Sequence, residues 1–227
     1  MRRLLAFAAL LLAAAPAAPA MAQGSAGAGA LTIGRLRYEG GGDWYANPSS
    51  LPNLLAEIRE QTGLPTAPRE VVVGLGDEVL WSVPYLYATG HGEIRLNDSE
   101  RDTLRRWLRQ GGFLHLDDNY GMDASIRREL AILLPGVPLE EVPLDHPVYS
   151  VVNRFPSGIP KIHEHDGKRP EGLGLFLDGR LAVFYSYETD LGDGWEDAGV
   201  HDDPPQKRQA ALGMGVNLFA YAVGYAR

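Results

Sequence analysis

Cysteine is missing from all 227 residues of this chain. Its absence excludes a disulfide framework, so the stability of the fold has to come from an apolar core. It also excludes every mechanism that uses a thiolate as nucleophile, metal ligand or redox group. Because 45% of the residues are hydrophobic, the chain has enough apolar side chains to build such a core.

Clusters of basic residues are missing as well. The chain has 21 Lys and Arg against 29 Asp and Glu, which gives a formal net charge of −8. Nucleic acids and anionic membranes are bound through clustered Lys and Arg, so we expect no nucleic-acid partner. The partners that remain are a small molecule, a carbohydrate or another protein.

The first 22 residues have the pattern of a cleaved signal peptide. Arg2 and Arg3 precede an apolar stretch at residues 4–15, and Ala20-Met21-Ala22 supplies an A-x-A cleavage site. Cleavage there would begin the mature chain at Gln23 and would make its net charge about −10, because two arginines leave. We therefore expect a periplasmic or secreted protein. The alternative is an uncleaved membrane anchor.

The rest of the chain predicts a short linker followed by one domain. Residues 23–30 are small and polar or glycine, which predicts a flexible linker. Residues 31–227 are enough for a single α/β domain and too few for two ordinary ones. Residues 210–226 are uncharged, yet their glycines and Asn217 favour a covering helix, so we expect no membrane span in the mature chain.

Two apolar stretches, residues 85–89 and 113–116, predict buried strands joined by an amphipathic helix. A capping box, Asn97-Asp98-Ser99-Glu100, begins that helix, and Gly111-Gly112 ends it. Together they form a βαβ unit. Because strands and helices continue to alternate up to a hairpin at Asp178-Gly179, we expect a flavodoxin-like three-layer sandwich with a mainly parallel sheet.

Polar side chains follow both organising strands. His91 follows the first, and Asp117, Asp118 and Asn119 follow the second. Ligands of open parallel sheets bind beyond the carboxyl ends of the strands. The paired acids, as a metal site or as a general base, and His91, as a base or ligand, are therefore the candidate catalytic residues. The alternatives are an acid that caps the next helix and a histidine that only completes a turn.

The densest group of metal-ligating side chains is His163-Glu164-His165-Asp166. In an extended segment His163 and His165 project to the same side, where with a carboxylate they could bind zinc or another divalent metal. The alternative is a loop held by hydrogen bonds.

Loops beyond the last strand supply the remaining candidates. Glu188 and Asp190 could close over the same crevice and, with Asn119, bind a ligand. Trp44 and Trp195 could stack on a sugar ring, or they could hold loops in place. His115 lies within a strand and is expected to be a packing residue. Ser186 is not in a G-x-S-x-G elbow, which argues against a serine hydrolase.

Four stretches of the chain resemble the bacterial domain of unknown function 4159: residues 85–92, 111–118, 160–167 and 190–197. The resemblance covers about residues 31–225 and implies no established activity. A more distant similarity, to the class I glutamine amidotransferase-like superfamily, rests on Gly111-Gly112 with its strand and on residues 178–185. It implies a three-layer sandwich.

In those amidotransferases the strand that resembles residues 113–117 leads into an elbow bearing a nucleophilic cysteine. Here Asp117-Asp118-Asn119 occupies that corner, so glutaminase chemistry is excluded. We expect an exported ligand-binding or hydrolase-like domain, in which a carboxylate or a metal-bound water replaces the thiolate. The alternative is a non-catalytic cell-envelope module that binds a glycan or a protein.

Overall fold

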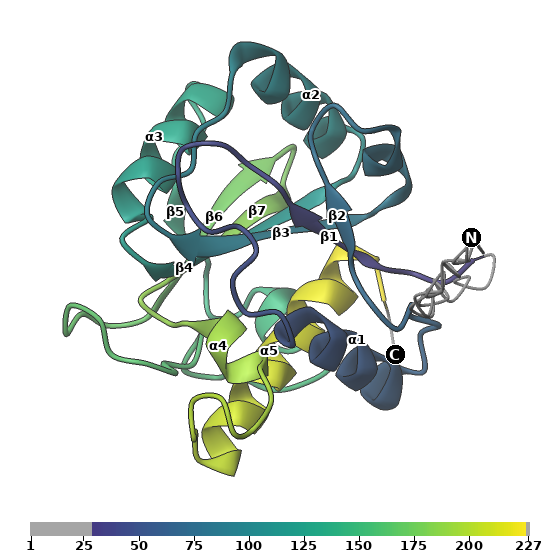
Figure 1. The fold of residues 1–227 in the computed structure, drawn as a ribbon, viewed down its shortest axis with the longest axis vertical. Coiled ribbons are helices and arrows are strands. Elements are labelled where there is room, and N and C mark those ends of the chain that lie inside the picture. The colour runs from purple at the N-terminus through teal and green to yellow at the C-terminus, as the bar shows by residue number, and fades with distance from the viewer. Residues whose placement is uncertain (1–28, 226–227) are drawn as a thin grey trace, which may run out of the picture.

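The computed structural model describes residues 29–225, so the predicted signal peptide and residues 23–28 of the predicted linker lie outside it. One seven-stranded sheet has the order β2-β1-β3-β4-β7-β6-β5 (Figure 1). The strands are β1 (Ile33–Leu36), β2 (Val71–Val73), β3 (Tyr85–His91), β4 (Phe113–Tyr120), β5 (Glu140–Glu141), β6 (Glu171–Leu177) and β7 (Arg180–Tyr187).

The neighbouring strands β2, β1, β3, β4 and β7 are parallel, whereas β6 is antiparallel to both β7 and β5. Helices cover both faces (Figure 1). The helices are α1 (Ser50–Thr62), α2 (Asp98–Arg109), α3 (Asp123–Leu133), α4 (Leu191–Trp195) and α5 (Pro205–Ala222), with short 3₁₀ turns η1 (Glu78–Ser82) and η2 (Pro147–Tyr149). The predicted α/β fold with a mainly parallel sheet is confirmed.

Helices α2 and α3 lie on one face of the sheet, and α2 forms for local reasons. The Asn97 side chain accepts a hydrogen bond from the Glu100 amide at 3.0 Å, and the Glu100 carboxylate accepts one from the Asn97 amide at 2.7 Å. This is the predicted capping box. Leu104, Trp107 and Leu108 form the buried stripe of the helix.

Helices α1, α4 and α5 cover the other face. Helix α5 is buried along all of residues 211–220, because α1 and α4 pack against it as well as the sheet. Gly215 permits this approach, since a Cβ there would lie 2.6 Å from a Leu54 methyl carbon and 2.9 Å from the Trp195 ring. Within the described residues, no helix is both long and apolar enough to cross a membrane.

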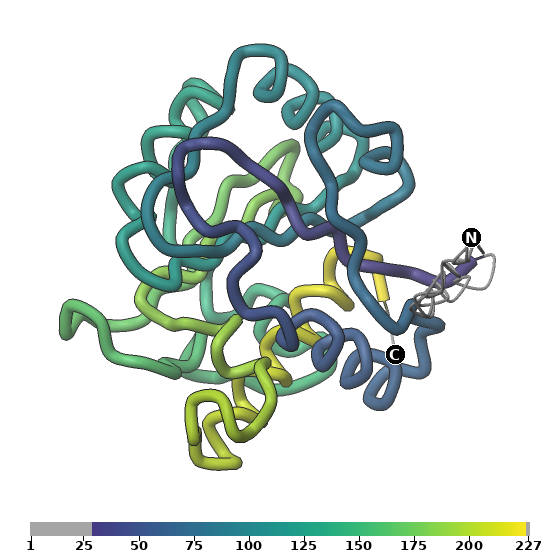
Figure 2. Tube along the Cα trace, viewed as in Figure 1, coloured from purple at the N-terminus to yellow at the C-terminus, as the bar shows by residue number. Residues whose placement is uncertain are grey.

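The long segment between β5 and β6 runs beside α5 (Figure 2). Asn217 of α5 holds it, since the side-chain nitrogen donates to the Val148 and Asn153 carbonyls at 3.0 and 2.8 Å. The side-chain oxygen of Asn217 accepts from the amides of Val152 and Asn153. After β6, Asp178 (φ 51°) and Gly179 (φ 80°) form the predicted hairpin turn.

Candidate functional site

The carboxyl ends of β3, β4 and β7 meet at one edge of the sheet, as the sequence predicts. Thr89 of β3 pairs with Asp117 of β4, and Asp117 pairs with Ser186 of β7. A cleft of about 300 Å³ opens beside the ends of β4 and β7. Its polar lining consists of Asp118, Asp123, His165, Asp166, Lys168 and Glu188, together with Tyr120 and Tyr187.

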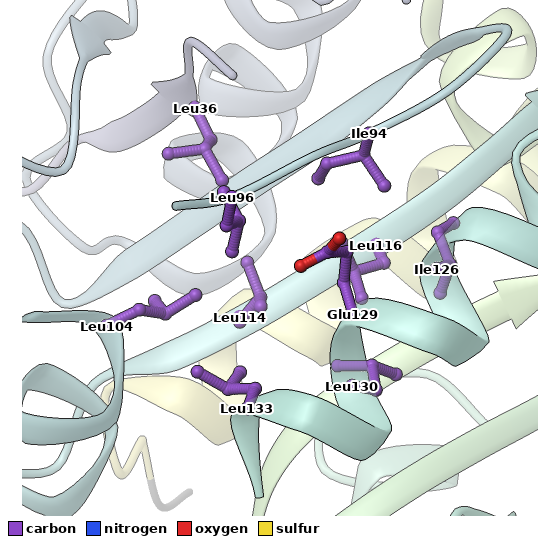
Figure 3. Close-up of a pocket in the computed structure, with 10 residues that line it drawn as sticks. All are labelled: Leu36, Ile94, Leu96, Leu104, Leu114, Leu116, Ile126, Glu129, Leu130 and Leu133. Carbon is purple, nitrogen blue, oxygen red and sulfur yellow. The ribbon is translucent and has the colours of Figure 1, made fainter. Parts of the chain in front are cut away.

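A second hollow, between the sheet and helices α2 and α3, is a gap in the core. Leucine and isoleucine side chains surround it (Figure 3), and its volume of about 10 Å³ is close to the space of one water molecule. The Glu129 carboxylate at its wall is buried and accepts hydrogen bonds of 3.0 and 2.9 Å from Arg101. This gap is too small for an organic ligand.

Asp117 and Asp118, which we expect to act as a pair, are separated by the sheet. Strand β4 continues through both residues to Tyr120, so their side chains leave opposite faces. Asp118 lines the cleft. One of its oxygens accepts a hydrogen bond from the Met122 amide at 2.8 Å, and the other lies 3.4 Å from the Tyr185 hydroxyl. Asp118 therefore also fixes the backbone at the start of α3. This is the structural role, an acid that caps the next helix, that the sequence leaves open as an alternative.

Asp117 is enclosed in the core on the side of α4. It accepts hydrogen bonds from the Ser186 hydroxyl, from the Tyr87 hydroxyl at 3.0 Å and from the Gly192 amide at 2.7 Å. Burial raises the pKa of Asp117 to about 7, although the hydrogen bond from Ser186 opposes that rise. Its hydrogen bonds hold β4, β7 and α4 together. Because Asp117 is 0% exposed, it does not line the cleft.

His115 continues this buried chain of polar groups. One ring nitrogen lies 2.8 Å from the Ser186 hydroxyl, and the other lies 2.9 Å from the Tyr85 hydroxyl. Burial lowers the pKa of His115 to about 3, so the ring is neutral. The predicted packing role of His115 is confirmed, since the residue is fully buried and both nitrogens have partners.

Three other candidates lie at or near the sheet edge without lining the cleft. Asn119 is buried and accepts a hydrogen bond from the Thr89 hydroxyl at 2.7 Å. His91 is exposed, and its ring nitrogen lies 3.1 Å from an Asp43 oxygen. Trp44 is half-buried in the loop between β1 and α1. Neither His91 nor Trp44 lines the cleft with Asp118.

Trp195 cannot stack on a ligand, because it belongs to the core. The short helix α4 carries it beneath the sheet, where it is 0% exposed. The indole nitrogen donates to the Ala211 carbonyl at 2.8 Å, and the ring packs against Tyr87 with 5.2 Å between centroids. The alternative role, holding segments in place, is the one that the structure shows.

Glu188 and Asp190 turn the chain back after β7, and both have the left-handed backbone that glycine usually supplies, with φ of 56° and 59°. Such a conformation costs about 1–3 kcal/mol for other residues and is concentrated at functional sites. Glu188 lines the cleft and accepts a hydrogen bond from Lys161 at 2.9 Å. Both carboxylates are nearly fully buried.

Asp190 lies between the two histidines that we predict as metal ligands. One of its oxygens is 2.6 Å from His165 Nε2 and 3.4 Å from His163 Nδ1. Hydrogen bonding to Asp190 raises the pKa of His165 and raises that of His163 to about 9. His165 lines the cleft, whereas the ring nitrogens of His163 lie near two further carboxylates.

Those carboxylates are Asp193 and Asp203. His163 Nδ1 lies 3.2 Å from Asp193, and its Nε2 lies 3.0 Å from Asp203. His201 Nε2 approaches the same Asp193 oxygen at 3.6 Å. Ligand atoms of His163, Asp193 and His201 all lie within 4.8 Å of one another, so these residues could hold a metal ion. Asp193 is not among the site residues that we predict, although a spacing of three from Asp190 in a helical turn places the two side by side.

A sequence model of a protein family, described as Domain of unknown function (DUF4159), matches residues 32–223. The chain belongs to the DUF4159 family. The family resemblance predicted from the sequence is thereby confirmed, and the match spans the whole sheet and all five α-helices of this DUF4159 domain. A comparison with curated proteins found no match. Since the family description names no activity, function has to be argued from the site.

Proposed function

We propose that this DUF4159 domain binds a small hydroxylated ligand of the carbohydrate class in its cleft and hydrolyses it with Asp118 as the general acid. The proposal rests on the position of Asp118 in the cleft and on the raised pKa of its carboxyl group. Burial raises the pKa of Asp118, although the Met122 amide and His165 oppose the rise. A carboxyl group with a raised pKa exchanges protons with a substrate more readily near neutral pH.

The lining of the cleft supports the ligand class. Asp123, Asp166 and Glu188 present carboxylates, which accept hydrogen bonds from hydroxyl groups. Tyr120 is 53% exposed at the same cleft, so its ring is accessible to a sugar ring. Four carboxylates line the cleft against two basic side chains, His165 and Lys168, which disfavours an anionic ligand.

Water is the nucleophile in this proposal, as it is in the inverting class of glycoside hydrolysis by paired carboxyl groups. Protonated Asp118 would give its proton to the leaving oxygen as the bond to that oxygen breaks, while a second carboxylate of the cleft lining would take a proton from the attacking water, as paired carboxyl groups do in glycoside hydrolysis. Proton exchange with solvent would then restore both groups. The hydrogen bond from the Met122 amide fixes the direction of the carboxyl group. His165, held by Asp190 at 2.6 Å, would hydrogen-bond to the ligand.

We extend the proposal to the wider fold class and to localisation. The strand order β2-β1-β3-β4-β7 supports a flavodoxin-like arrangement and, with the cleft at the carboxyl edge, the distant similarity to the class I glutamine amidotransferase-like superfamily. The leader pattern of residues 1–22 supports export to the periplasm or the medium. Mass spectrometry of the protein from an exporting host should find Gln23 at the N-terminus; an intact Met1 would contradict export.

A saccharide panel tests the activity. Neutral oligosaccharides are offered to the purified protein, and binding and hydrolysis are measured by calorimetry and by release of reducing ends. The Asp118→Asn variant should retain binding and lose about 10²–10⁴-fold in turnover. Asp102→Asn, on the exposed side of α2, is the matched control and should behave as the unaltered protein. Binding without any turnover would favour the non-catalytic module, and no binding would refute the proposal.

A further inference from the structure

We propose that His163, Asp193 and His201 form a binding site for Zn²⁺ or a chemically similar divalent transition-metal ion, beside the cleft. The three side chains come from the loop after η2, from α4 and from the loop before α5. The site does not depend on the proposed hydrolysis, since it rests on these loops and not on Asp118.

Two distances within the cluster, both to Asp193, match those between ligands of a tetrahedral metal. Ligand atoms about 2.0–2.1 Å from Zn²⁺ stand about 3.3 Å from one another. His163 Nδ1 and Asp193 Oδ2 are 3.2 Å apart, and His201 Nε2 and Asp193 Oδ2 are 3.6 Å apart. The second distance is too long for an ordinary hydrogen bond, yet it fits an edge of the tetrahedron.

In His163 and Asp193, the atoms that would not touch the metal are held by other residues. His163 uses Nδ1 toward the cluster, and its Nε2 lies 3.0 Å from Asp203 Oδ2. Asp193 uses Oδ2, and its Oδ1 accepts a hydrogen bond from the Asn47 side chain at 2.6 Å. Metal-binding histidines usually donate their other N–H to a carboxylate, and ligating carboxylates are themselves hydrogen-bonded. Both features are present here.

Asp190 supplies an independent sign that a cation belongs here. Its carboxylate is 96% buried, and its Oδ1 has no hydrogen-bond partner among the described residues. Its other oxygen lies 3.4 Å from His163 Nδ1. A buried carboxylate oxygen without a partner is costly, and a nearby divalent cation would relieve that cost.

The ligand types select the kind of ion. Two imidazole nitrogens and one carboxylate suit Zn²⁺ and its neighbours in the first transition row, whereas Mg²⁺ and Ca²⁺ prefer oxygen ligands. Three protein ligands leave a fourth position, which a water molecule would fill.

Metal binding is measured on purified protein without a histidine tag, after treatment with EDTA. Calorimetric titration with Zn²⁺ should give one ion per chain, whereas Mg²⁺ and Ca²⁺ should give no measurable binding. The His163→Gln/His201→Gln double variant should bind Zn²⁺ at least 100-fold more weakly. Asp203→Asn, which removes only the partner of His163, should weaken binding about 10–100-fold. His91→Gln alters another His–Asp pair and should bind as the unaltered protein does.

Two measurements distinguish a loss of metal binding from misfolding of the variant. Far-ultraviolet circular dichroism in EDTA verifies that each variant is folded, and the absorption of Co²⁺ bound to the unaltered protein reports tetrahedral coordination without any variant. Uptake of no Zn²⁺ by the unaltered protein, equal uptake by a folded double variant, or preference for Mg²⁺ would each overturn the site.

Discussion

Replacing Asp117 by asparagine should change how the stability of the domain depends on pH. His115 is neutral in the fold, because burial lowers its pKa to about 3, against 6.5 in an unfolded chain. When the pH falls below 6.5, the unfolded state gains a proton that the folded state does not take. Acidification from pH 6.5 to pH 3 therefore destabilises the fold through this residue.

Asp117 acts in the opposite direction. Its pKa is raised by burial to about 7, against 3.8 in an unfolded chain. Between these values the folded state keeps a proton that the unfolded state loses, so the contribution is complete below pH 3.8 and is lost as the pH rises toward 7. In the protein as it stands, the two effects cancel between about pH 4 and 6.5, and the pair adds no slope to the free energy of unfolding there.

Asp117→Asn removes the contribution of Asp117 and leaves that of His115. The free energy of unfolding should then fall by about 1.4 kcal/mol for each pH unit of acidification in the middle of this range, or roughly 3 kcal/mol between pH 6.5 and 4, beyond any change in the unaltered protein. Altered hydrogen bonds to Ser186, Tyr87 and Gly192 shift the whole curve and leave its slope unchanged. Only the slope is diagnostic.

The assay is urea unfolding at half-unit steps from pH 4 to pH 7.5, in EDTA so that no metal intervenes. His115→Gln is the mirror control, and its stability should fall as the pH rises from 4 to 7. Parallel curves for Asp117→Asn and the unaltered protein between pH 4 and 6.5 would refute the assignment of a proton to Asp117.

Two further predictions concern packing on the α2–α3 side. Gly112→Ala should destabilise the fold by about 1–3 kcal/mol, because the added Cβ would lie 2.3 Å from the Trp107 ring; Gly199→Ala, with nothing within 4 Å of its Cβ, should change urea unfolding by less than about 0.5 kcal/mol. Arg101→Met should cost about 3–5 kcal/mol at neutral pH, because it leaves the buried Glu129 carboxylate without its main cation. Adding Glu129→Leu should recover most of that loss, and an equally unstable double variant would contradict the argument.

The central βαβ unit could be predicted because its signals are local. The capping box at Asn97 and the stripe of Leu104, Trp107 and Leu108 lie within one helix, and parallel register then brings the strand ends together. The cleft at that edge follows from the topology. Prediction failed first at the end of β4, where the expected strand stops at Leu116 and the observed one continues to Tyr120.

The contacts of the loops could not be predicted in the same way. His163 meets Asp203 across forty residues, and both positions depend on how α4 and α5 pack beneath the sheet. Trp195 lies in a stretch rich in glycine and acidic residues, which is typical of an exposed ligand-binding loop. Only the burial of α4 shows that Trp195 belongs to the core. Hydrophobic periodicity indicates which face of an element is buried, but it carries no information on how irregular segments meet.

A single oxygen of Asp190 contacts His165 at the cleft and His163 in the proposed metal cluster. Any ion or ligand that displaces this oxygen therefore changes the contacts of both imidazole rings. Thermodynamic linkage requires the effect to be reciprocal, so that whatever factor one occupant imposes on the affinity of the other is returned in full. The Asp190 carboxylate is 96% buried and has little room to contact the two neighbours independently. The two sites would then behave as one cooperative unit.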